Sequence, residues 1–323
     1  MKTIRWGIIG CGDVTERKSG PAFSKVPGSQ LVAVMRRNGD AAADYAKRHG
    51  VPRWYDDADA LIADPEVDAV YVATPPGSHA SYAIAVATAG KPVYVEKPMA
   101  RTLAECEAMI AACESAEVPL FVAYYRRCLP HFMQAKQWLL EGRIGEVHGA
   151  RLSLFLRASQ DAAAAASWRY DAEAAGGGLL FDLGSHQLDI LDFLLGPVAD
   201  VQGKARNLGG HYAVEDTVSA RFTFESGTEG SALWCFAAGA GAERDEIELV
   251  GSRGKIILPT FGKTEATLVN ADGVTEFEVP TPDHVQQGLI ETIVAELRGQ
   301  GSCPSTGRSA ARTAWVLDQI AGR

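Results

Sequence analysis

The sequence lacks an apolar run that could span a bilayer, which takes about 20 consecutive residues. Its first residues also lack the basic segment, apolar stretch and small-residue cleavage site of a secretory signal, which predicts a protein that starts near Met1. We therefore expect a cytoplasmic protein with no membrane partner.

Paired cysteines and zinc-ligand spacings are also missing. The six cysteines occur singly, without a CxxC pair or interleaved histidines: Cys11, Cys106, Cys113, Cys128, Cys235 and Cys303. This pattern indicates free thiols in a reducing compartment, and no metal is expected.

Charge of one sign is nowhere concentrated. The net charge of −9 comes from 40 acidic and 31 basic residues, and no long block carries a single sign. Nucleic acid and anionic membrane surfaces are therefore poor candidate partners. A local basic pocket for an anionic cofactor remains compatible with this distribution.

What is present is globular composition, 47% hydrophobic and 22% charged, over 323 residues, enough for about two domains. Up to about Val122, short β-branched runs alternate with helical patterns, which is typical of a parallel sheet covered by helices. The expected strands are Ile4–Ile9, Leu31–Met35, Ala69–Ala73, Val93–Glu96 and Leu120–Ala123. The expected helices are Ala41–Arg48, Ala58–Ala63, Ser78–Ala89 and Leu103–Ala116.

Beyond Arg126 the pattern changes to a helix and longer alternating strands separated by turns, which indicates a mainly antiparallel sheet. The predicted elements are the helix Pro130–Leu140 and the strands Val147–Leu156, Val214–Phe224, Thr228–Phe236 and Glu246–Val250. The alanine-rich stretch Asp161–Ala166 is expected to form a mobile loop. Two amphipathic helices, Val285–Leu297 and Ser309–Ile320, complete the sequence and can pack on either domain.

The fold class expected from these patterns is α/β. Residues 1–124 are predicted to form a doubly wound parallel sheet, that is, a Rossmann dinucleotide-binding domain. Residues 125–323 are predicted to form a second α/β domain for substrate binding and oligomerisation.

A glycine loop follows the first expected strand. Its sequence is Gly10-Cys11-Gly12-Asp13-Val14-Thr15, and glycines there allow backbone N–H groups to approach a pyrophosphate at a helix start. Thr15 stands where the dinucleotide-binding pattern has its third glycine or alanine, so the pattern is incomplete. The alternative is a simple turn between strand and helix.

Two arginines follow the second expected strand. An NAD-preferring domain usually carries an acid there, whereas this chain has Arg36-Arg37-Asn38. Guanidinium groups bind a 2′-phosphate through charge-assisted hydrogen bonds, which favours NADP(H) over NAD(H). The alternative is that both arginines are solvated, and NAD(H) then remains possible.

The strand Val93–Glu96 runs into Lys97-Pro98. Proline restricts the preceding residue, so Lys97 is expected at the carboxyl edge of the sheet, where ligands bind in such folds. An ammonium group there can hydrogen-bond a hydroxyl or carbonyl and take part in proton transfer. Taken alone, a lysine at a strand end is more often solvated.

Three glycines, Gly176-Gly177-Gly178, precede an apolar segment that contains Asp182, His186 and Asp189. The spacing of Asp182 and His186 places them on one face of a helix, where the carboxylate can orient the imidazole as a general base. For Asp189 we favour a satisfied polar residue of the core. Burying several polar groups without partners is costly, so the Asp182–His186 pair favours function.

These segments in their order resemble the glucose–fructose oxidoreductase/inositol dehydrogenase family, Gfo/Idh/MocA, over nearly the whole chain. The matching motifs are Gly10-x-Gly12, Thr74-Pro75-Pro76-x-x-His79, Glu96-Lys97-Pro98, Trp168-Arg169 and Gly-Gly-Gly-x-x-x-Asp182-x-Gly184-x-His186-x-x-Asp189. The resemblance implies a Rossmann domain followed by a domain whose open antiparallel sheet often forms a subunit interface. A homodimer or homotetramer is therefore expected.

The resemblance also implies roles for individual residues. Lys97, Asp182 and His186 form the implied catalytic group, with either Lys97 or His186 as the principal acid–base. The implied cofactor contacts are Gly10, Gly12, Asp13, Val14, Arg36, Arg37, Thr74, Pro75, His79, Glu96, Lys97, Trp168 and Arg169. The implied substrate contacts are Lys97, Tyr125, Arg127, Asp182 and His186. For His79, a surface position at a helix start is an equal alternative. For Tyr125 and Arg127, a packing role is a comparable alternative to a substrate contact.

The implied activity is hydride transfer between a nicotinamide and a carbonyl or hydroxyl carbon of a carbohydrate-like small molecule: a sugar, cyclitol or related compound. Two other functions use the same scaffold: an NAD-dependent glycosidase with tightly bound cofactor, and a non-catalytic regulator that senses sugars or nucleotides. A regulator could dispense with Lys97 and His186, and both are present here.

Overall fold

The computed structural model describes residues 3–158 and 167–323. The predicted loop Asp161–Ala166 lies outside the described residues. The chain divides into two compact units, residues 1–125 with 282–311 and residues 126–281 with 312–323. Among the described residues, no helix is long and apolar enough to cross a membrane.

The first unit contains a six-stranded sheet in the order β3-β2-β1-β4-β5-β6. All five strand pairs are parallel, which confirms the doubly wound sheet. Its strands are β1 (Ile4–Ile9), β2 (Ser29–Met35), β3 (Arg53–Tyr55), β4 (Ala69–Val72), β5 (Val93–Val95) and β6 (Leu120–Val122). The sequence interpretation missed β3, a three-residue edge strand too short to show a period.

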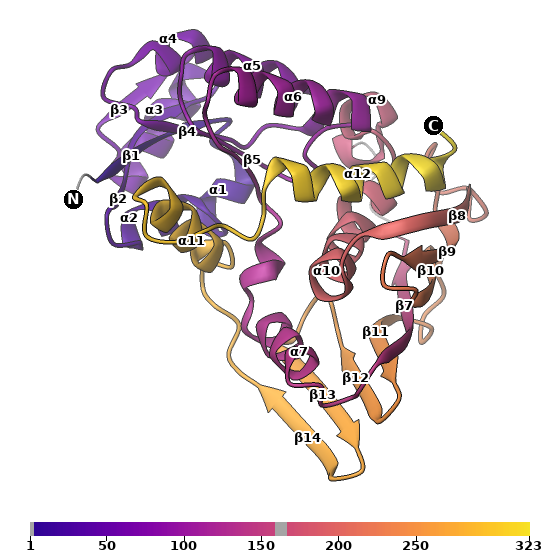
Figure 1. Cartoon of the computed structure of the whole chain (residues 1–323). Helices are drawn as coiled ribbons and strands as arrows, with labels where there is room; N and C mark the ends of the chain where they lie inside the picture. Colours follow the sequence, from indigo (N-terminus) through magenta and orange to yellow (C-terminus); the bar gives the residue numbers. More distant parts are fainter. Residues whose placement is uncertain (1–2, 159–166) are drawn as a thin grey trace. The chain divides into compact units, whose positions relative to one another are not determined.

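Helices cover this sheet, and α5 and α6 run side by side (Figure 1). The helices of the unit are α1 (Asp13–Arg17), α2 (Gly20–Lys25), α3 (Gly39–His49), α4 (Ala58–Ala63), α5 (His79–Thr88), α6 (Leu103–Ser115) and α11 (Gln287–Leu297). Helix α11 reaches this unit from far along the chain and packs on α2. The last helix, α12 (Gly307–Ala321), contributes residues to both units.

The second unit contains an eight-stranded sheet in the order β14-β13-β12-β11-β7-β10-β9-β8. Every pair is antiparallel except β7 with β10, so the sheet is mixed but mainly antiparallel, as expected. Its strands are β7 (Val147–Arg157), β8 (Val198–Arg206), β9 (Thr217–Phe224), β10 (Glu229–Ala238), β11 (Arg244–Gly251), β12 (Gly254–Leu258), β13 (Glu265–Asn270) and β14 (Gly273–Glu278).

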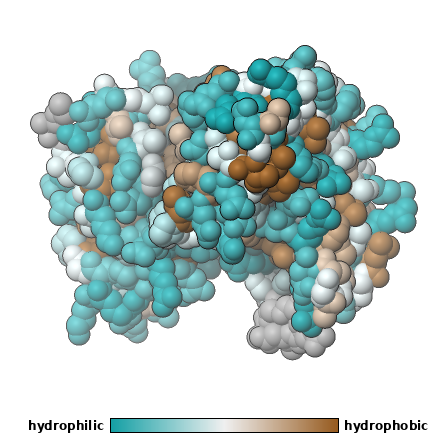
Figure 2. Space-filling model, turned by 90° about the horizontal axis from the view of Figure 1, so that it is seen from below, coloured by the Kyte–Doolittle hydropathy of each residue, from teal (hydrophilic) through white to brown (hydrophobic). Residues whose placement is uncertain are grey.

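One face of this sheet is apolar and the other is charged. Alternate residues such as Leu152, Trp234 and Leu249 are buried, whereas their neighbours Arg151 and Glu248 form an ion pair on the other face. The helices are α7 (Pro130–Leu140), which packs on β12–β14, α9 (Ala172–Ala175) and α10 (Ser185–Leu195). The face of the molecule in Figure 2 is mostly hydrophilic, with hydrophobic residues in small groups.

Candidate functional site

The glycine loop lies between the carboxyl ends of β1, β2 and β4. Gly10 has φ +91°, and a Cβ atom on it would lie 2.7 Å from Cγ2 of Thr74. The backbone N–H groups of Gly10 and Cys11 donate to the carbonyl oxygen of Met35, at 2.9 and 3.1 Å. Glycine is required at position 10 because of this conformation and this close approach.

Thr15 has a definite part in the loop although it departs from the glycine pattern. Its hydroxyl donates to the carbonyl oxygen of Gly12 at 2.8 Å and accepts from the N–H of Gly12 at 3.0 Å. A Cβ atom on Gly12 would meet only the carbonyl oxygen of Gly10, at 3.9 Å, so the loop leaves open space beside Gly12. Asp13 and Val14 follow in the first turn of α1, with Asp13 exposed. The open backbone fits a closely approaching dinucleotide.

Arg36 and Arg37 are exposed directly after β2. Asn38 ends this segment, and its side chain accepts from the N–H of Ala41 to cap α3 at 3.0 Å. Burial raises the pKa of the Cys11 thiol to about 11, and the positive charge of Arg36 acts in the opposite direction. The charge of Arg36 therefore reaches the glycine loop, and no acid stands at the end of β2.

Lys97 lies half-buried in a turn directly after β5. The N–H of Glu96 donates to the carbonyl oxygen of Val72 at 2.9 Å, which places this turn beside the end of β4 and the Thr74–Pro75 segment. The buried carboxylate of Glu96 accepts from Tyr71 Oη at 2.5 Å and from the N–H of Lys97 at 3.1 Å. The first unit thus brings the predicted lysine and the glycine loop to one edge of its sheet.

His79, at the start of α5, is fully buried, so the surface alternative is wrong. Its Nε2 lies 2.6 Å from the carbonyl oxygen of Thr74. Its Nδ1 lies 3.0 and 3.2 Å from the carbonyl oxygens of Pro98 and Met99. Burial lowers the pKa of His79, while hydrogen bonds to these carbonyls act in the opposite direction.

The glycine-rich segment differs from the expected helix. After α9 the chain turns at Gly176, φ +86°, and forms a π-helical turn, Leu180–Gly184, before α10 begins. Asp182 lies in the π turn, where a single α-helical face was expected to carry both Asp182 and His186. Turns of this kind occur frequently at functional sites because they redirect side chains.

Asp182 pairs with the predicted residue Arg169. The Nε atom of Arg169 lies 3.2 Å from Oδ2 of Asp182, and the guanidinium lies 4.6 Å from the ring centroid of Trp168. His186 is buried at the start of α10, edge-on to the ring of Phe261. The second unit thus gathers Trp168, Arg169 and Asp182.

Helix α10 is fixed to the sheet next to His186. The Nε1 group of Trp234 donates to Oε1 of Gln187 at 2.7 Å, and Nε2 of Gln187 donates to the hydroxyl of Thr260 at 3.0 Å. Because Gln187 follows His186 directly, these two bonds fix the position of the histidine along the sheet.

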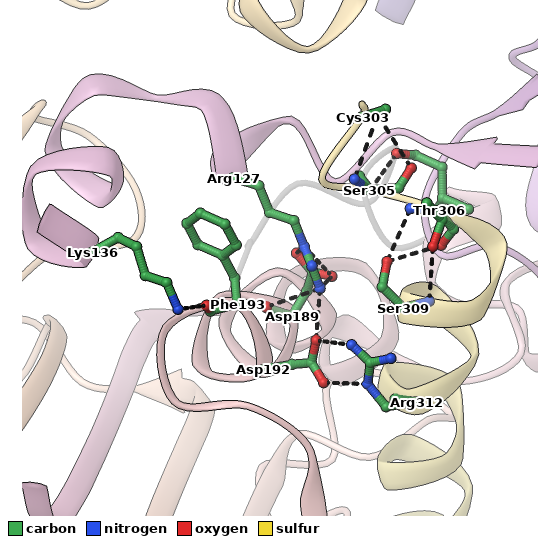
Figure 3. Close-up of polar contacts among 11 residues, drawn as sticks. Arg127, Lys136, Asp189, Asp192, Phe193, Cys303, Ser305, Thr306, Ser309 and Arg312 are labelled. Carbon is green, nitrogen blue, oxygen red and sulfur yellow. Dashed lines mark hydrogen bonds and ion pairs between the residues drawn. The ribbon is translucent and has the colours of Figure 1, made fainter. Parts of the chain in front are cut away.

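Arg127 lies in a buried ion-pair network (Figure 3). Its guanidinium donates to Asp189 at 2.7 Å and to Asp192 at 2.9 Å, and Arg312 pairs with Asp192 from the other side. The interpretation of Asp189 as a satisfied core residue is confirmed. For Arg127 this geometry supports the packing alternative over a substrate contact. Tyr125 is buried at the start of the 3₁₀ turn Tyr125–Cys128.

Sequence reasoning missed two residues near the predicted ones. Gln286, before α11, donates to Glu96, and Phe261, in the loop after β12, lies against His186. Neither belongs to a motif, and no sequence signal marks them. Within residues 3–158 and 167–323, no group of three or more His, Cys, Asp or Glu side chains could hold a metal ion.

Two family models match the chain. The model "Oxidoreductase family, NAD-binding Rossmann fold" (GFO_IDH_MocA) matches residues 4–124, and the model "GFO/IDH/MocA C-terminal domain" matches residues 132–257.

Three known proteins illustrate the similarity. Oxidoreductase P35 of Formosa agariphila is 37% identical over 322 residues, 99% of this chain and 98% of that protein. The 1,5-anhydro-D-fructose reductase of Ensifer adhaerens is 28% identical, covering 94% of this chain and 91% of that protein. A levoglucosan dehydrogenase solved with NADH and levoglucosan superposes with a TM-score of 0.88 at 25% identity, covering 99% of this chain and 96% of that one.

Proposed function

We propose that this chain, which belongs to the GFO/IDH/MocA oxidoreductase family, prefers NADP(H) and acts on a sugar, cyclitol or related small molecule. It is a dehydrogenase or reductase that uses an NAD(P) cofactor. The reaction is hydride transfer between the nicotinamide and a CH–OH or C=O carbon, for which the bound nicotinamide supplies or accepts the hydride.

The observation that carries the proposed hydride-transfer reaction is the position of Lys97. Its turn follows β5 at the sheet edge that also carries the glycine loop and Thr74, all within the first unit. Ligands of doubly wound folds bind at this edge. An ammonium there can hold the substrate oxygen and stabilise the negative charge that develops on it during reduction.

The proposed catalytic group consists of Lys97, Asp182 and His186. In reduction, Lys97 or His186 delivers a proton to the carbonyl oxygen, and in oxidation the same group removes it from the alcohol. Asp182 carries a negative charge that Arg169 holds in place. Sugar substrates are supported by relatives that are named for activity on 1,5-anhydro-D-fructose, D-apiose and scyllo-inositol.

The proposed NADP(H) preference rests on Arg36 and Arg37. Both guanidiniums are exposed beside the loop, and two cations at this position suit a phosphate dianion better than a ribose hydroxyl. A solved relative binds NADH, so the preference is a property to be measured on this chain.

The test is a titration of the purified protein with NADPH and, separately, NADH, followed by tryptophan fluorescence. We expect tighter binding of NADPH, a loss of about tenfold or more in R36A, and no loss for NADH. R308A is the matched control, because Arg308 is an exposed arginine that pairs with Glu114. Equal binding of the two cofactors by wild type and R36A would contradict the NADP(H) proposal.

A second arm tests the reaction. Sugars, cyclitols and their keto forms are screened by the absorbance of the reduced nicotinamide, with K97M as the inactive control. Turnover of a glycoside without net redox change would favour the glycosidase instead. Absence of binding by either nucleotide, with no cofactor found in the protein by mass spectrometry, would favour the regulator.

We also propose that the chain forms a homodimer or homotetramer through the charged face of its eight-stranded sheet. That face carries Arg151, Arg221, Glu229 and Glu248 around an open hollow of about 440 Å³. Light scattering after size exclusion tests this, and a monomer at all concentrations would contradict it.

A further inference from the structure

Gln286 links the two segments of the chain that form the first unit, residues 1–125 and 282–311. It is fully buried and directly precedes α11, in the segment that returns to this unit after residue 281. Its Nε2 group donates to Oε1 of Glu96 at 2.6 Å, and its Oε1 atom accepts from the hydroxyl of Tyr94 at 2.7 Å. A carboxylate only accepts hydrogen bonds, so the amide nitrogen must face Glu96 and the amide oxygen must face Tyr94.

Glu96 receives donors on both carboxylate oxygens. Tyr71 and Gln286 donate to Oε1, and the backbone N–H of Lys97 donates to Oε2. Burial raises the pKa of Tyr71 well above its ordinary value, so its hydroxyl keeps its proton. These three donors fix the orientation of the buried carboxylate. The bond from the N–H of Lys97 to Oε2 then fixes the position of the Lys97 backbone.

The backbone of Gln286 is itself held in place. Its N–H donates to the carbonyl oxygen of Lys18 at 3.2 Å, and the N–H of Ile290 donates to the carbonyl oxygen of Gln286 at 3.0 Å. His284, two residues earlier, lies with Nδ1 2.7 Å from the carbonyl oxygen of Arg17. Because this backbone is held, the side-chain amide of Gln286 starts from a fixed position, from which it holds the Glu96 carboxylate in one orientation.

We propose that Gln286 is a positioning residue for the reaction: through Glu96 it fixes the turn that presents Lys97. Gln286 is fully buried and donates to Glu96, so the proposed action runs through the carboxylate next to the lysine. This inference rests on the proposed function in so far as Lys97 takes part in the chemistry.

The experiment compares three variants. Q286L removes the donor to Glu96 while keeping a side chain of similar volume. Y94F removes the hydroxyl that donates to the amide oxygen of Gln286, and Y55F removes a tyrosine hydroxyl that donates to Asp64 elsewhere in the same unit. We expect Q286L to lower kcat about tenfold with cofactor Kd within twofold, Y94F to lower it about twofold, and Y55F to leave it unchanged.

A second readout follows Lys97 without any substrate. Acetylation of Lys97 by an acetyl ester is measured across pH by peptide mass spectrometry, with the exposed Lys47 as internal reference. We expect Q286L and E96Q to change the Lys97 profile alike, and Q286L/E96Q to add nothing beyond either single variant. This readout remains decisive if no substrate is turned over, so failure of the proposed function and failure of this inference are distinguishable.

A folded Q286L with the kcat and the Lys97 profile of wild type would overturn the proposal. So would additive effects of Q286L and E96Q, because Gln286 would then act by another route. If Q286L does not fold, Q286N takes its place, since the shorter side chain withdraws the amide donor from Glu96 and remains polar. Its kcat and Lys97 profile are then expected to change as stated for Q286L, and wild-type values would overturn the proposal.

Discussion

The Nδ1 atom of His79 lies 3.0 Å from the carbonyl oxygen of Pro98, the residue that follows Lys97. Its other ring nitrogen lies 2.6 Å from the carbonyl oxygen of Thr74. One buried imidazole thus links the Thr74–Pro75 segment, which the resemblance implies contacts the cofactor, with the turn of the proposed catalytic lysine. A substitution of His79 should therefore affect both the Thr74 segment and the Lys97–Pro98 turn.

Replacing His79 by leucine is therefore expected to weaken cofactor binding and to lower kcat, each by about tenfold, because both segments lose the imidazole that packs between their carbonyl oxygens. Fluorescence titration and steady-state rates measure the two effects. H79Q keeps a donor and should recover part of both losses, whereas H148Q changes an exposed histidine and should alter neither. A folded H79L with one property at the wild-type level would argue against the link.

The network around Arg127 leads to a prediction on stability. The Arg127 side chain is 4% exposed and pairs with two buried aspartates, whereas Arg312 is 43% exposed. R127M should lower the free energy of unfolding by about 3–5 kcal/mol, since Asp189 is left buried without its cation. R312M, the matched control, should cost about 1 kcal/mol or less.

Urea unfolding followed by circular dichroism measures both variants. Because D189N removes the charge left behind, R127M/D189N should recover part of the loss. If R127M instead keeps the stability of wild type and raises KM for the substrate, Arg127 has the substrate role that the family resemblance implies.

The sequence predicted many of the larger elements of the fold, although β8 and β12–β14 were not among the strands it indicated. Strands such as Ile4–Ile9 and helices such as Leu103–Ala116 have strong patterns, and the structure places them within a residue or two. The short strand Arg53–Tyr55 and the parallel pairing of β7 with β10 could not be predicted, because the first has no period and the second depends on partners far apart in the sequence. The placement of α11 in the first unit is likewise a tertiary effect.

The candidate site was predictable where short motifs carry it. Lys97 precedes a proline, and His79 follows Thr74-Pro75-Pro76, so both stand out in the sequence. Gln286 does not, since a single glutamine before a helix resembles any surface residue, and only the fold brings it to Glu96. The π turn at Asp182 was missed because helical spacing alone does not distinguish it from an α-helix.

A variant of Arg169 distinguishes two roles for this residue: positioning Asp182 and contacting the cofactor directly. Its guanidinium pairs with Asp182, so R169Q should lower kcat by about tenfold by freeing this carboxylate, with cofactor Kd within twofold. Steady-state rates and fluorescence titration give the two values. R157Q is the control, because Arg157, at the end of β7, pairs with Glu243 in the loop before β11. A raised cofactor Kd with unchanged kcat would instead identify Arg169 as a direct cofactor contact.

His131 makes stability depend on pH in a defined direction. Burial lowers the pKa of His131 from 6.5 to about 4, and the positive charge of Arg126 adds to the effect. The folded protein therefore keeps this imidazole neutral in a range where the unfolded chain protonates it. The free energy of unfolding should fall as pH is lowered from about 6.5 to about 4, with a loss of about 3 kcal/mol from this group.

The measurement is urea unfolding of wild type and H131Q at several pH values between 4 and 7.5. Other groups titrate in this range, so the difference between the two proteins isolates His131: it should be constant above pH 7 and should shift in favour of H131Q as pH falls. H148Q, an exposed histidine, should run parallel to wild type. If the wild-type and H131Q curves run parallel over the whole range, then His131 titrates alike in the folded and unfolded chains, and its burial does not hold it neutral.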